Sequence, residues 1–247
     1  MISIASAELG AGLRKGLAVA TVLLACHGCA TVTNPDPRDP LESFNRGVFA
    51  FNEGLDQAVV KPVATMYRAV TPAPVRTGVG NFLGNLDDGW SFVNSLLQLK
   101  LRAAVDNFMR FAVNTTFGLF GVLDVASEMQ IDRHSEDFGQ TLGRWGVGSG
   151  AYLVLPVLGP STLRDGLAAM VDYNHDIVAH SDVRTRNTVW ALDLIDTRAT
   201  LLDVSSTLDD VALDKYSFTR DAFLQRRQNA VYDGDPPDTE AGSGDRQ

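Results

Sequence analysis

Two cysteine thiols, at Cys26 and Cys29, are the side chains whose position in this sequence points most directly to chemistry. Cys26 ends the tetrapeptide 23–26 (LLAC) and directly follows an uncharged, apolar-rich run over residues 16–25. Two basic residues precede that run, as in a secretory signal peptide, and the run is too short to span a bilayer. The thiol of Cys26 is therefore a candidate acceptor of acyl chains.

The tetrapeptide resembles the lipobox of bacterial lipoproteins, in which the cysteine is diacylated and becomes the new N-terminus. We expect a lipoprotein signal peptide over residues 1–25 and a lipid anchor at Cys26. Cys29 is the alternative acceptor, although His27 would then fill a position of the box that usually holds an apolar or small residue. A plain secretory signal with incidental cysteines is a further alternative. Because His27 and not aspartate follows Cys26, the usual inner-membrane retention signal is absent, which favours the outer membrane.

Histidine, serine and glycine residues elsewhere do not form a recognisable site. His175 and His180 are five residues apart, which puts their imidazoles on different faces of a helix and argues against a metal site. Ser161 follows a Gly-Pro pair and lacks the Gly-x-Ser-x-Gly setting of a hydrolase nucleophile. The glycine cluster over residues 143–150 has no lysine placed as in a phosphate-binding loop. We therefore predict no catalytic residue, no metal and no cofactor, and we do not expect an enzyme.

Composition restricts the class of partner and the number of domains. The 247 residues are 45% hydrophobic, which is enough for one folded domain, and they carry a formal net charge of -9. A chain this acidic repels phosphate backbones, so we expect no nucleic-acid ligand.

The two ends of the mature chain differ from its middle. Residues 26–38 are rich in proline and polar residues and read as an extended tether, whereas residues 233–247 are Pro/Gly-rich and acidic and read as a disordered tail. Residues 39–232 show helical spacing of apolar residues and no run of alternating strands. We therefore expect one all-α domain over residues 39–232.

A phenylalanine-rich amphipathic helix is predicted at the start of this domain. Asp39 is its expected N-cap, and Lys61-Pro62 is expected to end or kink it. Its apolar positions recur at spacings of three and four: Leu41, Phe44, Val48, Phe51 and Leu55.

A second, very apolar segment covers residues 90–113, with Asp87 or Asp88 as its expected cap. Scattered polar and charged residues interrupt it, so it is not a plain transmembrane span. A kinked helix or an antiparallel pair, buried in protein or in lipid, fits the pattern.

The segment over residues 137–165 is apolar and glycine-rich, and we expect an irregular loop there. Because surface loops are usually polar, such a loop is either packed inside or exposed to something apolar. Ser161 or Thr162 is then expected to cap a helix that runs to about Tyr173, and two more helices are predicted near residues 189–202 and 208–231.

Four strings in this chain closely resemble the MlaA (VacJ) family of outer-membrane lipoproteins, and they occur in the family's order. They are residues 39–64 (DPLESFNRGVFAFNEGLDQAVVKPVA), 81–86 (NFLGNL), 110–126 (RFAVNTTFGLFGVLDVA) and 137–165 (DFGQTLGRWGVGSGAYLVLPVLGPSTLRD). The match runs from the lipobox to about residue 227. The doubled cysteine departs from the family's pattern and leaves the acylated position open.

The resemblance implies a ring of helices in the inner leaflet of the outer membrane, with an amphipathic channel through it and a trimeric porin alongside. It also implies that phospholipid misplaced in the outer leaflet is passed to a soluble periplasmic lipid-binding protein, which maintains lipid asymmetry. A structural envelope lipoprotein and a periplasmic hydrolase are the alternative functions.

The apolar stripes and the glycine-rich loop agree with such a function, because phenylalanines suit acyl chains and glycines suit a mobile gate. Arginines and asparagines near apolar helices are expected to contact headgroups. A tightly turned core loop is the alternative for residues 139–160. The candidate residues of the lipid path and gate are Phe44, Phe51, Leu142, Trp145, Tyr152, Leu153 and Leu155.

Overall fold

The computed structural model describes residues 36–175, 178 and 180–236, and most of that part is helical. The signal peptide, both cysteines and most of the tether and tail lie outside the described residues. The elements in chain order are α2 (Glu42–Leu55), the π-helical η1 (Asp56–Val60), α3 (Lys61–Val70), α4 (Ala73–Leu97), α5 (Leu101–Phe117), α6 (Val125–Glu128), α7 (Phe138–Arg144), β1 (Tyr152–Leu155), β2 (Gly159–Thr162), α8 (Leu163–His175), α9 (Val183–Thr200), α10 (Leu202–Val211) and α11 (Lys215–Val231).

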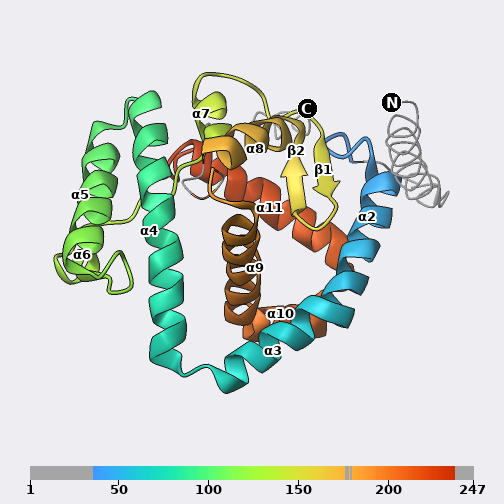
Figure 1. Ribbon diagram of the computed structural model, residues 1–247. Coiled ribbons are helices and arrows are strands. Elements are labelled where there is room, and N and C mark those ends of the chain that lie inside the picture. The colour runs from blue at the N-terminus through green and yellow to red at the C-terminus, as the bar shows by residue number, and fades with distance from the viewer. Residues whose placement is uncertain (1–35, 176–177, 179, 237–247) are drawn as a thin grey trace, which may run out of the picture.

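The long helices form a frame (Figure 1). Helices α4, α3 and α2 make three of its sides, and α11 runs along the fourth beneath α8 and the β1–β2 hairpin. Helix α9 stands within the frame and contacts α3 and α4, while α5 packs along the outer side of α4. The all-α class is confirmed, with one short antiparallel hairpin added to it.

The first predicted helix extends further than the sequence indicated. Helices α2, η1 and α3 are continuous, because the Lys61 amide bonds to the Asp56 carbonyl five residues back and Pro62 then falls in the first turn of α3. The π-helical turn accommodates a proline that has no N–H and whose ring would clash with a preceding carbonyl. The expected N-cap at Asp39 is wrong: Leu41 takes that position, and the buried Asp39 carboxylate binds elsewhere.

The apolar region after residue 72 is an antiparallel pair, as one of the two expectations stated, but its start was misplaced. Helix α4 runs without a break from Ala73 to Leu97, so Asp87 and Asp88 lie inside it and cap nothing. The chain turns between α4 and α5 at Leu99, whose φ of 59° is left-handed. The α4–α5 pair lies on one side of the frame in Figure 1.

The glycine-rich segment is not one irregular loop. It contains α7, a turn and the hairpin, in which Tyr152 pairs with Thr162 and Leu155 with Gly159. The loop expectation failed because two four-residue strands, one of them containing a proline, are too short to show alternation. The Thr162 hydroxyl caps α8 by accepting from the Asp165 amide at 3.1 Å, as one of the two expected caps.

The last predicted helix is divided into two. Helix α10 ends at Val211, and α11 begins at Lys215 with Asp214 as its N-cap, whose carboxylate accepts from two backbone amides of the first turn. Beyond α11, Asp233 pairs with Lys100 at 2.6 Å. The start of the predicted tail therefore contacts the folded domain.

Candidate functional site

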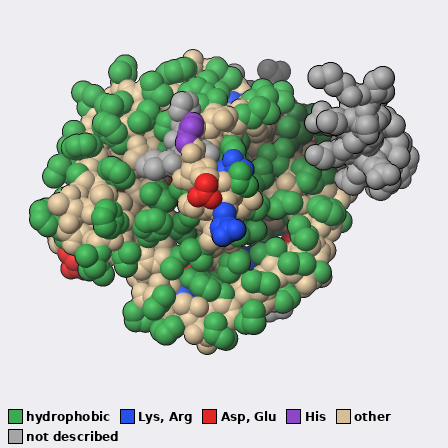
Figure 2. All heavy atoms as spheres, viewed as in Figure 1, with side chains coloured by type: hydrophobic (Ala, Val, Ile, Leu, Met, Phe, Trp, Pro, Cys, Tyr) green, Lys and Arg blue, Asp and Glu red, His purple; other side chains and the backbone are tan. Residues whose placement is uncertain are grey.

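The surface of the frame is largely apolar. Figure 2 shows hydrophobic side chains over most of one face, with a few charged side chains gathered near its middle. On the outer side of α5, Leu101 is 66% exposed and Val105 is 60% exposed. The end of α5 and the turn that follows it add three more exposed hydrophobic residues: Phe117, Leu119 and Phe120. Soluble monomers rarely expose contiguous apolar surface on this scale, so this surface fits contact with lipid.

None of the helices within the described ranges is long and apolar enough to cross a membrane.

The interior is unusually polar. Among the described residues, more polar and charged side chains are buried than hydrophobic ones. Many of them lie along two antiparallel helices: Asn85, Asp88, Ser91, Asn94 and Ser95 on α4, Gln98 directly after it, and Asn107, Arg110 and Asn114 on α5. Their spacing of three and four puts each set on one helix face. Apolar surface outside and bonded polar groups inside is the arrangement that a lipid environment favours.

Arg110 is the centre of this polar interface and is only 2% exposed. Its Nη2 donates to both carboxylate oxygens of Asp124 at 2.8 Å, and its Nη1 donates to the Ile131 carbonyl at 2.7 Å. Its Nε lies 3.4 Å from Asp88, whose pKa is raised by burial. Acceptors within the protein thus bind the Arg110 guanidinium. The expectation that such arginines contact lipid headgroups is therefore wrong for Arg110.

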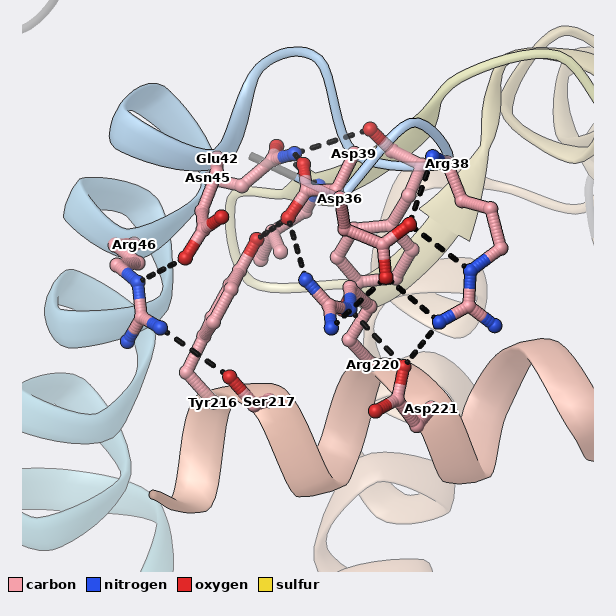
Figure 3. Close-up of polar contacts among 12 residues, drawn as sticks. Asp36, Arg38, Asp39, Glu42, Asn45, Arg46, Tyr216, Ser217, Arg220 and Asp221 are labelled. Carbon is pink, nitrogen blue, oxygen red and sulfur yellow. Dashed lines mark hydrogen bonds and ion pairs between the residues drawn. The ribbon is translucent and has the colours of Figure 1, made fainter. Parts of the chain in front are cut away.

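A second polar cluster joins the start of the domain to α11 (Figure 3). The buried Asp39 carboxylate accepts from the Tyr216 hydroxyl and, at 2.7 Å, from the Asn45 amide. Arg220 lies 3.5 Å from Asp39 and 3.2 Å from Asp36. Burial, followed by the hydrogen bond to Asp39, raises the pKa of Tyr216 above its ordinary value, so the hydroxyl keeps its proton and remains a donor.

Two asparagines of α2 hold the hairpin against that helix. The Asn45 amide donates to the Tyr152 carbonyl at 3.0 Å, and its oxygen accepts from the Val154 amide at 2.9 Å. Asn52 binds the hairpin turn in the same way, donating to the Leu155 carbonyl at 2.9 Å and accepting from the Val157 amide at 2.8 Å. Each asparagine therefore replaces a missing strand partner.

We expect Tyr216→Phe to lower the free energy of unfolding by about 1–3 kcal/mol, because the buried Asp39 carboxylate loses a donor. Tyr173→Phe is the matched control, since Tyr173 is 51% exposed, and we expect a change within about 0.5 kcal/mol. Urea unfolding in a mild detergent measures both. Equal stability of the two variants would show that the Tyr216 hydroxyl contributes nothing.

The structure divides the predicted lipid-path residues into two groups. Phe44 packs against the core cluster that contains Tyr152, and Leu153 and Leu155 are half-buried on the same strand. Phe51, on α2, is 53% exposed. Tyr152 is completely buried and lies on β1 rather than in an irregular loop.

The second group lies at the end of α4. Trp145 follows α7, is 56% exposed, packs edge-on against Phe138 and donates from its indole to the Leu97 carbonyl at 3.0 Å. Leu142 is half-buried on α7.

The sequence predicted a helix over residues 208–231, but the polar residues of α11 were not among the predicted site residues. Tyr216, Arg220 and Arg227 are separated by four and seven residues and so share one face, and this polar stripe was the available signal. Arg227 binds Asp137 and Asp165 together, at 2.6 and 3.0 Å from its Nη2. Burial acts to raise the pKa of both carboxyls, but the bonds to Arg227, together with Gln140 at Asp137 and Arg164 at Asp165, outweigh it and lower both pKa values. The residue thereby fastens α11 to α7 and α8.

A cavity of about 760 Å³ lies between α11 and the turn over residues 146–150. Its arginines, Arg38, Arg164 and Arg227, are each paired with a carboxylate. Within the described residues, no group of three or more metal-ligating side chains comes together.

Comparison with known proteins gives consistent matches. A family model described as MlaA lipoprotein matches residues 37–230. The intermembrane phospholipid transport system lipoprotein MlaA of Escherichia coli (strain K12) is 39% identical over 218 residues, which cover 86% of each chain. The Haemophilus influenzae protein of the same name is 34% identical over 221 residues, covering 85% of this chain and 88% of that one. A solved structure, described as the structural basis for maintenance of bacterial outer membrane lipid asymmetry, superposes with a TM-score of 0.71 at 36% identity and covers 78% of this chain and 98% of its own.

Proposed function

The chain belongs to the MlaA lipoprotein family, and from this premise we propose that it removes misplaced phospholipid from the outer leaflet of the outer membrane and passes it to a periplasmic carrier. Phospholipid transport and the maintenance of lipid asymmetry are the functions named for its relatives. The observation that carries the proposal is the apolar exterior around a polar interior. The chain acts without covalent chemistry and is not an enzyme.

The physical problem in moving a phospholipid is its charged headgroup, which is costly to place in hydrocarbon without polar partners. The apolar exterior of the frame lies among acyl chains, and a path through the frame must offer the headgroup polar groups as an alternative to water. The frame of α2, α3, α4 and α11 is the ring, and the lipid passes through it. A trimeric porin beside the ring holds it at the correct depth, and a soluble periplasmic lipid-binding protein receives the lipid.

Acyl chains on Cys26 attach the protein to the periplasmic side of the outer membrane through the tether. Several chains on one cysteine anchor stably, whereas one chain binds only marginally. We expect Cys26→Ala to abolish incorporation of radiolabelled palmitate while the domain still folds, because the anchor precedes the folded part. Cys29→Ala is the control and should incorporate palmitate normally. Undiminished labelling of Cys26→Ala would instead assign the anchor to Cys29.

We propose that the hairpin with its glycine-rich approach is the gate, and that Asn52 is its latch on α2. Asn52→Ala removes both hydrogen bonds to the turn, so we expect faster amide hydrogen exchange over residues 155–159 and a changed rate of lipid release. Asn174→Ala is the control, since that amide donates to the Met170 carbonyl within its own helix. Unchanged exchange in the hairpin of Asn52→Ala would rule out the latch.

Lipid analysis of the detergent-purified protein tests the proposed function. We expect phospholipid to co-purify in a defined ratio to protein. A structural envelope lipoprotein would carry none, and a hydrolase would release lysophospholipid or fatty acid from added phospholipid. Either result would replace the proposal by the corresponding alternative.

A further inference from the structure

A polar cavity of about 400 Å³ lies between the first half of α4 and the helices α9 and α10. The charged side chains that line it are two arginines and two aspartates: Arg68, Arg76, Asp196 and Asp203. Thr77 and Asn81 add neutral polar groups. In Figure 1, α9 stands within the frame and α10 lies at its foot near α3, so the cavity is at this end of the frame, where the first half of α4 begins.

Arg76 is a charged side chain of this cavity with donors left for a ligand. Its Nη1 donates to the carbonyls of Arg68 and Thr71, at 2.8 and 2.7 Å, which fixes the guanidinium at the end of α3. Within the described part of the chain, no carboxylate pairs with Arg76, and its Nε and Nη2 donate to no protein acceptor. These two N–H groups present the fork that binds phosphate oxygens.

The other charged side chains of the cavity have an exposed ion-pair partner or a hydrogen bond to one of their oxygens. Arg68 pairs with Asp203 at 2.9 Å, but the two side chains are 38% and 84% exposed, so the pair contributes little and can exchange partners. Asp196 accepts from the Tyr67 hydroxyl at 2.9 Å through one oxygen. Its other oxygen, Oδ2, lies 3.4 Å from the position that a Cβ would take at Gly80.

An apolar groove of about 490 Å³ adjoins the cavity around α4. Its lining includes Val75, Gly78, Val79, Phe82, Val122 and Leu192. A third hollow shares Thr77 and Asn81 with the polar cavity and Gly78 and Val122 with the groove, so the three lie next to one another around α4. The groove also continues onto the exposed apolar turn after α5, which we place in contact with lipid.

We propose that this cavity binds the headgroup of a zwitterionic aminophospholipid, with the phosphate on Arg76, the amine beside Asp196 and Asp203, and an acyl chain in the adjoining groove. The inference rests on the proposed function and specifies its substrate class. The choice of headgroup follows from charge: a purely anionic headgroup would meet two carboxylates at close range, whereas a headgroup that carries both signs is complementary to the cavity.

The test uses the full-length lipoprotein in nanodiscs that contain equal amounts of phosphatidylethanolamine and phosphatidylglycerol, followed by native mass spectrometry of the released protein. The wild type is expected to retain phosphatidylethanolamine preferentially. Arg76→Gln is expected to retain about tenfold less of both lipids, because the phosphate is common to them. Asp196→Asn, which still accepts from Tyr67, is expected to lose the preference and keep phosphatidylglycerol.

A steric variant separates binding in the cavity from binding elsewhere on the apolar surface. Gly80→Leu places a side chain in the cavity beside Asp196 and is expected to lower retention of both lipids about tenfold. Gly54→Leu is the matched control, since Gly54 is also helical and nothing lies within 4 Å of an added Cβ. Equal retention by the two leucine variants would overturn the proposal.

The outcomes distinguish this inference from the proposed function. If the wild type retains phospholipid but the lipid ratio is the same in wild type and Asp196→Asn, the headgroup site is wrong and the transport function stands. If the wild type retains no phospholipid, both are wrong.

Discussion

Replacing Arg110 by methionine is expected to lower the free energy of unfolding by about 3–5 kcal/mol, the cost of removing one partner from a buried ion pair. Methionine fills similar space but leaves the Ile131 carbonyl without its donor and Asp124 without its bidentate partner. Burial acts to raise the pKa of Asp124, and hydrogen bonds, led by that of Ser127, outweigh it and lower the pKa to about 2. Without Arg110, the hydrogen bonds from Ser127 and Asn114 remain to stabilise the negative charge of the Asp124 carboxylate, so burial destabilises that charge more strongly.

Arg102→Met on the same helix is the control. Its side chain is 89% exposed and lies 3.9 Å from Asp106, so the loss is expected to stay below about 1 kcal/mol. Urea unfolding of both variants in a mild detergent gives the comparison. If Arg110→Met were as stable as Arg102→Met, the polar interface between α4 and α5 would not be what holds these helices together.

The second large effect concerns the outer side of α5. Leu101→Asp combined with Val105→Asp puts two charges on the apolar surface, where each is expected to cost about 2.5–3.5 kcal/mol if the side chain lies in hydrocarbon. Membrane binding should fall by more than about a hundredfold. The measurement is liposome flotation of protein that lacks both cysteines, so that the folded domain alone determines binding.

The control adds the same two charges four residues apart on α9, as Asn187→Asp with Ala191→Asp. Both positions are exposed, but α9 stands within the frame rather than on its outer side. Flotation of this control should match the unsubstituted domain. Loss of flotation in both double variants would mean that added charge alone, and not its place on α5, prevents binding.

The sequence predicts the helices well because their apolar residues recur at helical spacing, and it fails where partners are distant. The phenylalanine stripe located α2, but the N-cap was assigned to Asp39 from its Asp-Pro pattern, whereas its carboxylate binds Tyr216, 177 residues further along. Asp87 or Asp88 was expected to cap the segment over residues 90–113, but both lie inside α4, where Asp88 pairs with Arg133. Local patterns identify helix faces and cannot say which distant side chain satisfies a polar group.

The candidate site shows the same limit. Apolar residues such as Phe44, Tyr152 and Leu155 were recognised as a set, and the structure does bring Phe44 and Tyr152 together. Trp145 was assigned to the same set by its neighbourhood in the sequence, but it contacts the end of α4 instead. The charged cavity beside α4 combines residues of four helices, α3, α4, α9 and α10, and no spacing in one segment indicates it.

The amount of phospholipid in the outer leaflet of living cells tests the central claim most directly. It is measured by labelling lipids from outside in cells that have the gene, lack it, or regain it on a plasmid. The account predicts more outer-leaflet phospholipid when the gene is deleted and a return to the original level when it is restored. An unchanged outer leaflet after deletion would contradict the claim that this chain removes misplaced phospholipid.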